Sequence, residues 1–406
     1  MNRRSFLLMT GGLLSLPATS IARQAETGAP LPARRPGELD IHHIDTGRGN
    51  STLIIGPDGT SLLIDAGASP GFSDLVAPAR PDDSLRPGQW IARYARNHAP
   101  AIDILVATHI HPDHVGDVTA SSPLAPGGDY RLTGISEVAA EMPVKRVIDR
   151  GFPGYGDRPP PQADFALNYL AYLKWRRGQG QPVEPFAVGS DTQMALNAPQ
   201  AFPTFKIRNL AASGRIWTGQ GDDTRDLFAA RPKDAAVDEN LCSAALRLSY
   251  GAFSYFAGGD LTCDTFDGQA PWRDVETPVV ELAGRTEVAA VDHHGYFDAC
   301  GPAFVRALNA QVYVVQAWHA THPGQAQLQR LLGAWADKTQ ADVFLTENLA
   351  ANHALNARFL SKVRSLQGHV VIRVEPGGDR YQVFVLDSTQ RATPVAAVFG
   401  PYTSRV

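Results

Sequence analysis

The residues Ala107-Thr-His-Ile-His-Pro-Asp-His-Val-Gly-Asp117 bring three histidines and an aspartate together in one short stretch. These four side chains are His109, His111, Asp113 and His114. Imidazoles this close repel one another when they are charged, and a buried carboxylate is costly without a partner. Because a bound divalent cation is the simplest thing that makes such a cluster favourable, the stretch predicts a metal site rather than a structural cluster.

The chain around this stretch predicts the fold class. The run from Ile102 to Val106, apolar except for Asp103, is typical of a short strand buried on both faces. The histidines then lie on the loop after the carboxyl end of a strand, where layered α/β proteins carry their sites. We expect a helix to begin near Val115. Two strand-rich halves with helices between them predict an α/β protein, a four-layer αββα sandwich.

The composition narrows the class of function. The chain has 406 residues, of which 44% are hydrophobic and 19% are charged, as is typical of a folded enzyme. Its formal net charge is -4 and it has no block of Lys or Arg, so nucleic-acid binding is allowed but not favoured. Cys242, Cys263 and Cys300 form no CxxC pair, which argues against thiolate metal ligands. Small buried thiols are the simplest interpretation, and pairing of Cys263 with Cys300 is the alternative.

Residues 1–25 have the pattern of an export signal. Arg3-Arg4-Ser-Phe-Leu precedes a short apolar run and a region of small residues. The paired arginines indicate the twin-arginine route, so we expect the export machinery as a partner and a periplasmic or secreted protein. The apolar run is too short to span a bilayer as a helix, so no transmembrane domain is expected in the mature chain. The alternative is an ordinary N-terminal segment with a chance Arg-Arg pair.

His109-x-His111-x-Asp113-His114 resembles the signature of the metallo-β-lactamase superfamily. Further parts of that pattern follow the expected order along the chain: Asp65, Asp260 within Phe256-Ala-Gly-Gly-Asp-Leu261, and the doublet His293-His294-Gly295. The resemblance implies that one metal is held by His109 and His111. It implies that a second is held by Asp113, His114 and one histidine of the doublet, that Asp260 is shared, and that Asp65 is structural. His293 is the choice within the doublet because it is nearer the strand end, and His294 is the alternative.

A narrower resemblance is to the hydrolase domain of competence-type DNA-uptake proteins. It rests on residues 41–50, 240–251, 258–260, 293–295 and 322–323, and it extends over residues 39 to 390. The membrane channel of those proteins has no counterpart here. We therefore expect a linker at 26–38, a hydrolase domain at 39–390 with insertions around 120–238 that shape a substrate cleft, and a C-terminal tail at 391–406.

One departure from the superfamily pattern concerns the first metal. The superfamily usually supplies a third histidine there, yet no histidine lies between His114 and His293. Asp149, Asp238, Asn240 or a water are the candidates to replace it. The sequence therefore predicts one firmly held metal and a second, weaker one.

Imidazole and carboxylate ligands suit zinc, with manganese or iron as alternatives, and we expect up to two ions per chain. A divalent metal provides a bound hydroxide at neutral pH, and the resemblance to competence-type proteins implies that this exported hydrolase acts on a phosphoester or phosphodiester. Asp113 is expected to orient the hydroxide or pass a proton, and His294 and His322 to face the substrate as donors or shuttles. Two alternatives stay open. One is a lactone, carboxylic ester or β-lactam hydrolase, and the other is a non-catalytic metal-binding protein.

Overall fold

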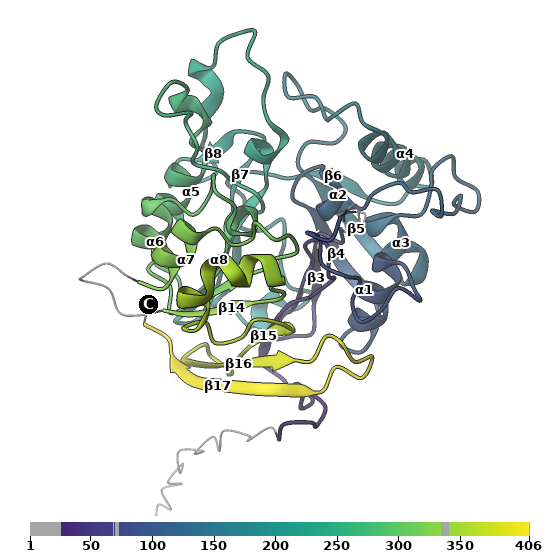
Figure 1. Cartoon of the computed structure of the whole chain (residues 1–406). Helices are drawn as coiled ribbons and strands as arrows, with labels where there is room; N and C mark the ends of the chain where they lie inside the picture. Colours follow the sequence, from purple (N-terminus) through teal and green to yellow (C-terminus); the bar gives the residue numbers. More distant parts are fainter. Residues whose placement is uncertain (1–25, 68, 70–72, 334–340, 406) are drawn as a thin grey trace, which may run out of the picture.

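The computed structural model describes residues 26–67, 69, 73–333 and 341–405. The predicted export signal, residues 1–25, therefore lies outside the described residues. Within the described part of the chain, the strands form a nine-stranded sheet and an eight-stranded sheet (Figure 1). No helix in these ranges is both long and apolar enough to cross a membrane.

The first sheet has the order β17-β16-β15-β1-β2-β3-β4-β5-β6. Its strands are β1 (Leu39–His43), β2 (Thr52–Ile55), β3 (Ser61–Ile64), β4 (Ile102–Ala107), β5 (Val144–Asp149), β6 (Val183–Pro185), β15 (His369–Val374), β16 (Arg380–Leu386) and β17 (Val395–Thr403). Strand β4 runs parallel to β3 and β5, which places its apolar residues between two layers.

The second sheet has the order β14-β13-β12-β11-β10-β7-β8-β9. Its strands are β7 (Phe205–Ala212), β8 (Arg215–Trp217), β9 (Thr224–Asp226), β10 (Ala245–Tyr250), β11 (Phe253–Ala257), β12 (Val288–Ala290), β13 (Val312–Val315) and β14 (Asp342–Leu345). Strands β11 to β14 run parallel to one another, so their carboxyl ends share one edge of the sheet.

Helices cover the outer face of each sheet (Figure 1). The helices are α1 (Pro87–Arg96), α2 (Pro112–Val115), α3 (Gly134–Glu141), α4 (Asp164–Gly178), α5 (Glu276–Ala283), α6 (Pro302–Leu308), α7 (Gln325–Leu331) and α8 (Ala350–Leu360). One apolar cluster joins α1, α3 and α4 to the first sheet, and another joins α5 to α8 to the second. A third cluster, including Ile104 and Tyr255, lies between the sheets. These three cores make the four layers of the predicted αββα sandwich.

Three local expectations differ from the structure. No helix begins at Val115; α2 instead ends there, and the next residue, Gly116, has φ 97, which breaks the helical path. The expected tail at 391–406 contains β17, the edge strand paired with β16. Residues 120–238 contribute β5 to β9 to the two sheets, so this range does not consist of insertions alone.

The segment predicted as a linker lies against the domain. Gly28 N donates to Val395 O at 2.8 Å, and Val395 N donates to Ala29 O at 2.8 Å. Arg373 also donates to Pro32 O at 2.6 Å. All three cysteines are free thiols, with Cys242 and Cys300 buried.

Candidate metal centre

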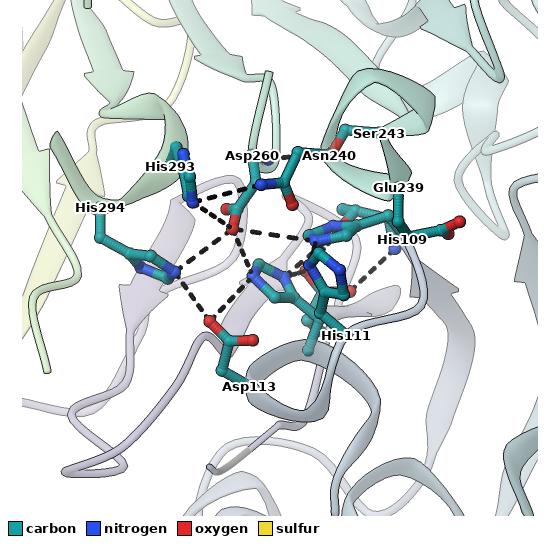
Figure 2. Close-up of polar contacts among 12 residues, drawn as sticks. His109, His111, Asp113, Glu239, Asn240, Ser243, Asp260, His293 and His294 are labelled. Carbon is teal, nitrogen blue, oxygen red and sulfur yellow. Dashed lines mark hydrogen bonds and ion pairs between the residues drawn. The ribbon is translucent and has the colours of Figure 1, made fainter. Parts of the chain in front are cut away.

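Four buried side chains converge where loops leave the two sheets. Asp113 and His114 lie on α2 after β4, Asp260 follows β11, and His294 lies on a 3-10 turn (Asp292–Gly295) after β12. Their potential ligand atoms all lie within 4.8 Å of one another. His294 Nε2 is 2.9 Å from Asp113 Oδ2, and His114 Nε2 is 3.1 Å from Asp260 Oδ2 (Figure 2). We call these four residues the ligand group.

The second ring nitrogen of each histidine in the ligand group is held by an acceptor. His114 Nδ1 donates to Asp65 Oδ2 at 2.7 Å, and His294 Nδ1 donates to the Gln316 carbonyl at 2.9 Å. Because a carboxylate and a carbonyl only accept, the proton of each neutral ring stays on Nδ1. The lone pair of Nε2 then faces the centre, which is the arrangement that metal-ligating histidines adopt.

The ligand group fits a divalent cation. His114 Nε2 and Asp260 Oδ1 are buried and have no hydrogen-bond partner. Buried polar atoms without a partner are costly, and a cation between them removes that cost. Oxygen and nitrogen donors without a thiolate suit zinc, and also manganese or iron.

The charges at the ligand group are strongly coupled in the metal-free protein. Burial lowers the pKa of His294, but the Asp260 and Asp113 carboxylates outweigh burial and raise it to about 9. Burial raises the pKa of Asp113, but His114 and His294 outweigh it and hold that pKa well below its usual range. The acids are therefore ionised, and a proton on the imidazoles supplies the positive charge that a cation otherwise brings.

His109 and His111 form a second, adjoining pair. His109 Nε2 is 3.1 Å from His111 Nδ1 and 3.8 Å from Asp260 Oδ2. On its other side, His109 Nδ1 lies 3.2 Å from Thr108 Oγ1, which donates to Asp65 Oδ2 at 2.7 Å. Burial lowers the pKa of both histidines, so both are neutral and able to bind a metal. The Asp260 carboxylate thus lies between this pair and the other three residues of the ligand group.

The doublet is arranged differently from the prediction. His294 is in the ligand group, whereas His293 Nε2 is 3.9 Å from Asp260 Oδ2 and its Nδ1 is 2.7 Å from Asp298 Oδ1. Both histidines have positive φ, 45° and 54°, so the turn sends their rings in directions that a strand pattern does not predict. The geometry therefore favours His294 over His293 as the ligand of the second metal. With both nitrogens of His294 engaged, its expected role as a substrate-facing donor does not fit this arrangement.

His322 lies beside the ligand group rather than in it. Its ring stacks on that of His294, with centroids 4.9 Å apart and planes at 18°. Burial and the neighbouring His294 hold the pKa of His322 well below its usual value. Three residues at the site could not be found from a local sequence signal. Asp298 contacts His293, and Trp318 Nε1 lies 3.2 Å from His294 Nε2. Glu239 accepts a hydrogen bond from Ile110 N.

Comparisons with known proteins agree with this site. Residues 44–123 match the family model described as the metallo-beta-lactamase superfamily, a range that includes Asp65 and the residues from His109 to His114. No curated protein sequence matches the chain. The two packed sheets with outer helices have the metallo-β-lactamase fold, and the match to the family model covers residues 44–123 of the chain. The narrower resemblance to competence-type proteins is not confirmed by any of these comparisons.

Solved structures with low sequence identity also match. A variant of the CmlA β-hydroxylase matches with a TM-score of 0.41 and 12% identity over 84% of this chain and 55% of that chain. A diphosphatase of the PhnP family matches with a TM-score of 0.36 and 11% identity, over 84% of this chain and 98% of that chain. A candidate metal-dependent hydrolase from Parabacteroides distasonis matches with a TM-score of 0.36 and 12% identity, over 76% of this chain and 92% of that chain.

Proposed function

We propose that this chain is an exported, zinc-dependent hydrolase of a phosphoester or phosphodiester. The observation that carries the proposal is the ligand group, in which buried acceptor atoms converge and two of them lack a partner. A bound divalent metal supplies a water of lowered pKa and stabilises charge on a phosphoryl oxygen. Export rests on the Arg3-Arg4 segment of the sequence.

The position of Asp260 favours phosphoryl chemistry. Its Oδ2 is 3.1 Å from His114 Nε2 and 3.8 Å from His109 Nε2, so one carboxylate lies between two sets of imidazoles. This arrangement suits a pair of neighbouring cations. Paired cations are the usual device for in-line displacement at phosphorus, since they stabilise both the attacking and the leaving oxygen.

His322 has the features of a substrate-facing group. It is only 5% exposed, and its Nδ1 has no hydrogen-bond partner among the described residues. Because burial keeps the ring neutral, this nitrogen is available to form a hydrogen bond to a substrate. Asp113 holds the His294 ring through its Oδ2.

The test is a substrate panel on the purified mature chain loaded with Zn²⁺ or Mn²⁺. The panel contains bis(p-nitrophenyl) phosphate, p-nitrophenyl phosphate and single-stranded DNA, beside a lactone, a carboxylic ester and a β-lactam. We expect turnover of at least one phosphoester, lost on chelation. Clear lactone or β-lactam hydrolysis without turnover of any phosphoester would contradict the proposal.

A further inference from the structure

The first metal side is one protein ligand short, and two of the predicted replacements are already engaged. The Asp149 carboxylate accepts from Gly151 N, Phe152 N and Tyr169 Oη. The Asp238 carboxylate accepts from Asn240 N at 3.0 Å and lies 3.5 Å from an Arg273 nitrogen. The oxygens of both carboxylates are engaged in these interactions, whereas Asn240 Oδ1 has no hydrogen-bond partner, so Asn240 is the remaining protein candidate.

Asn240 is held close to both metal loops by its neighbours on the 3-10 turn Glu239–Cys242. Glu239 Oε1 accepts from the backbone N of Ile110, the residue between His109 and His111, at 2.8 Å. Arg150 fixes the same carboxylate, with its Nε 2.6 Å from Oε1 and its Nη2 2.8 Å from Oε2. This buried ion pair attaches the turn to the loop that carries His109.

The same turn is also attached to the shared aspartate. Ser243, the residue just after the turn, accepts through Oγ from Asp260 N at 3.0 Å. Asn240 is only 8% exposed, and it lies between these two attachments along the chain. The backbone of Asn240 is therefore held both next to the loop that carries His109 and next to Asp260.

The amide of Asn240 is oriented by a chain of hydrogen bonds. His293 Nδ1 lies 2.7 Å from Asp298 Oδ1, which fixes the His293 ring on one side. On the other side of the ring, Asn240 Nδ2 lies 3.3 Å from His293 Nε2. The amide nitrogen of Asn240 therefore faces His293.

The oxygen of the Asn240 amide is the atom that has no contact of this kind. Asn240 Oδ1 is buried and has no hydrogen-bond partner. In Figure 2 it points toward the His109 ring, on the side of Asp260 away from His294. A buried oxygen without a partner, on the His109 side of Asp260, has the chemistry of a metal ligand.

We propose that Asn240 binds the first metal through Oδ1, beside His109, His111 and Asp260, with His293 and Asp298 as positioning residues. This inference rests on the proposed function. A neutral amide oxygen suits manganese better than an imidazole does and holds zinc less firmly. The first site is therefore expected to bind Zn²⁺ more weakly than the ligand group and to discriminate less between Zn²⁺ and Mn²⁺.

The test is a metal titration of the purified mature chain, read as bound Zn²⁺ per chain after dialysis and as the Kd of the weaker ion. Wild type should bind two ions of unequal affinity. Asn240→Ala should keep the tight ion and weaken the other by at least about 10-fold, and Asn240→His should tighten it by a similar factor. Asn356→Ala is the matched control, because Asn356 Oδ1 is also buried without a partner, on α8.

Three results overturn the inference: one bound ion in wild type, unchanged affinity of the weaker ion in both Asn240 variants, or loss of that ion in His293→Ala but not in Asn240→Ala. Cobalt spectra give a second readout, since Asn240→His adds a nitrogen donor and should change the visible absorption of the weaker site. Wild type with no tight metal at all would instead contradict the proposed function. A wild-type protein that binds one ion tightly and cleaves a phosphoester, with Asn240 variants whose metal affinities are unchanged, would contradict this inference alone.

Discussion

His114 Nδ1 lies 2.7 Å from Asp65 Oδ2, and both side chains are buried. The same carboxylate accepts from Thr108 N at 2.8 Å and from Thr108 Oγ1 at 2.7 Å. Asp65 therefore fixes the ring of a metal ligand and the residue that precedes His109. Its contribution to metal binding acts through these neighbours, because Asp65 lies outside the ligand group.

Asp65→Asn should weaken zinc binding by about 10- to 100-fold, the usual effect of removing a partner that orients a metal-bound histidine. The amide cannot accept from His114 Nδ1 and from Thr108 together as well as the carboxylate does. Competition with a chromophoric chelator measures the affinity. Asp342→Asn, which alters a partly exposed pair with Arg364, is the control and should leave zinc affinity unchanged. Equal affinities in both variants would contradict the role of Asp65.

Metal-free protein should lose thermal stability as the pH rises from about 7 to about 9.5. The pKa of His294 is raised to about 9, since Asp260 and Asp113 outweigh the effect of burial, whereas a histidine in the unfolded chain titrates near 6.5. A raised pKa gives stabilisation that is complete below the unfolded value and is lost as the pH passes through the folded value. Calorimetry of chelator-treated protein measures the change in Tm.

Zinc-loaded protein is the control for this pH effect. Zinc requires the neutral imidazole, so its affinity should rise with pH over the same range and the loss of Tm should be absent. Zinc binding near pH 7 should also release protons into a weakly buffered solution, and fewer above about pH 9. A metal-free protein whose Tm rises over this range would show that His294 is not protonated in the folded state.

Gly67→Ala should disrupt the metal loop. A Cβ at Gly67 would lie 1.9 Å from the backbone carbon of Asp113 and 2.1 Å from His114 N, so the two ligands must move. Overpacking of this kind costs about 1–3 kcal/mol or more, and here it also displaces metal ligands. Gly154→Ala, where a Cβ meets nothing within 4 Å, is the control. Chemical denaturation and bound zinc are the two measurements, and an unchanged Gly67→Ala protein would refute the close approach.

Sequence reasoning identifies the parts of this site that are local. The histidines and Asp113 lie in one stretch after an apolar strand, so their chemistry is readable directly from the chain. Asp260 lies far away in sequence and enters only through a family resemblance. The choice between His293 and His294 depends on two consecutive positive φ values, which no hydrophobic pattern records.

The supporting residues are less predictable for a different reason. Glu239 accepts from Ile110 N across 129 positions of the chain, and Asp298 meets His293 within an irregular turn. Such contacts depend on how two sheets are brought together, and single residues in loops carry no periodic signal for them. The edge strand β17 was missed because its residues alternate poorly, with buried Val395 followed mainly by exposed or half-buried positions.

Replacement of Arg3 and Arg4 by Lys should retain the chain in the cytoplasm of a bacterial host. The twin-arginine route requires the arginine pair, whereas Lys preserves the charge of the segment. Cell fractionation followed by immunoblotting shows where the protein accumulates. Replacement of Arg23 by Lys is the control and should not alter the distribution. Equal export of both variants would show that the proposed route is wrong.

The central claim is that the ligand group holds a catalytic metal, and metal content per chain tests it most directly. Mass spectrometry of dialysed wild type should find at least about one tightly bound zinc ion, and His114→Ala should lose it because this ring donates the central Nε2. His353→Ala, on the exposed face of α8, should keep the wild-type content. Wild type with less than about one ion per chain, or His114→Ala with unchanged content, would contradict the account.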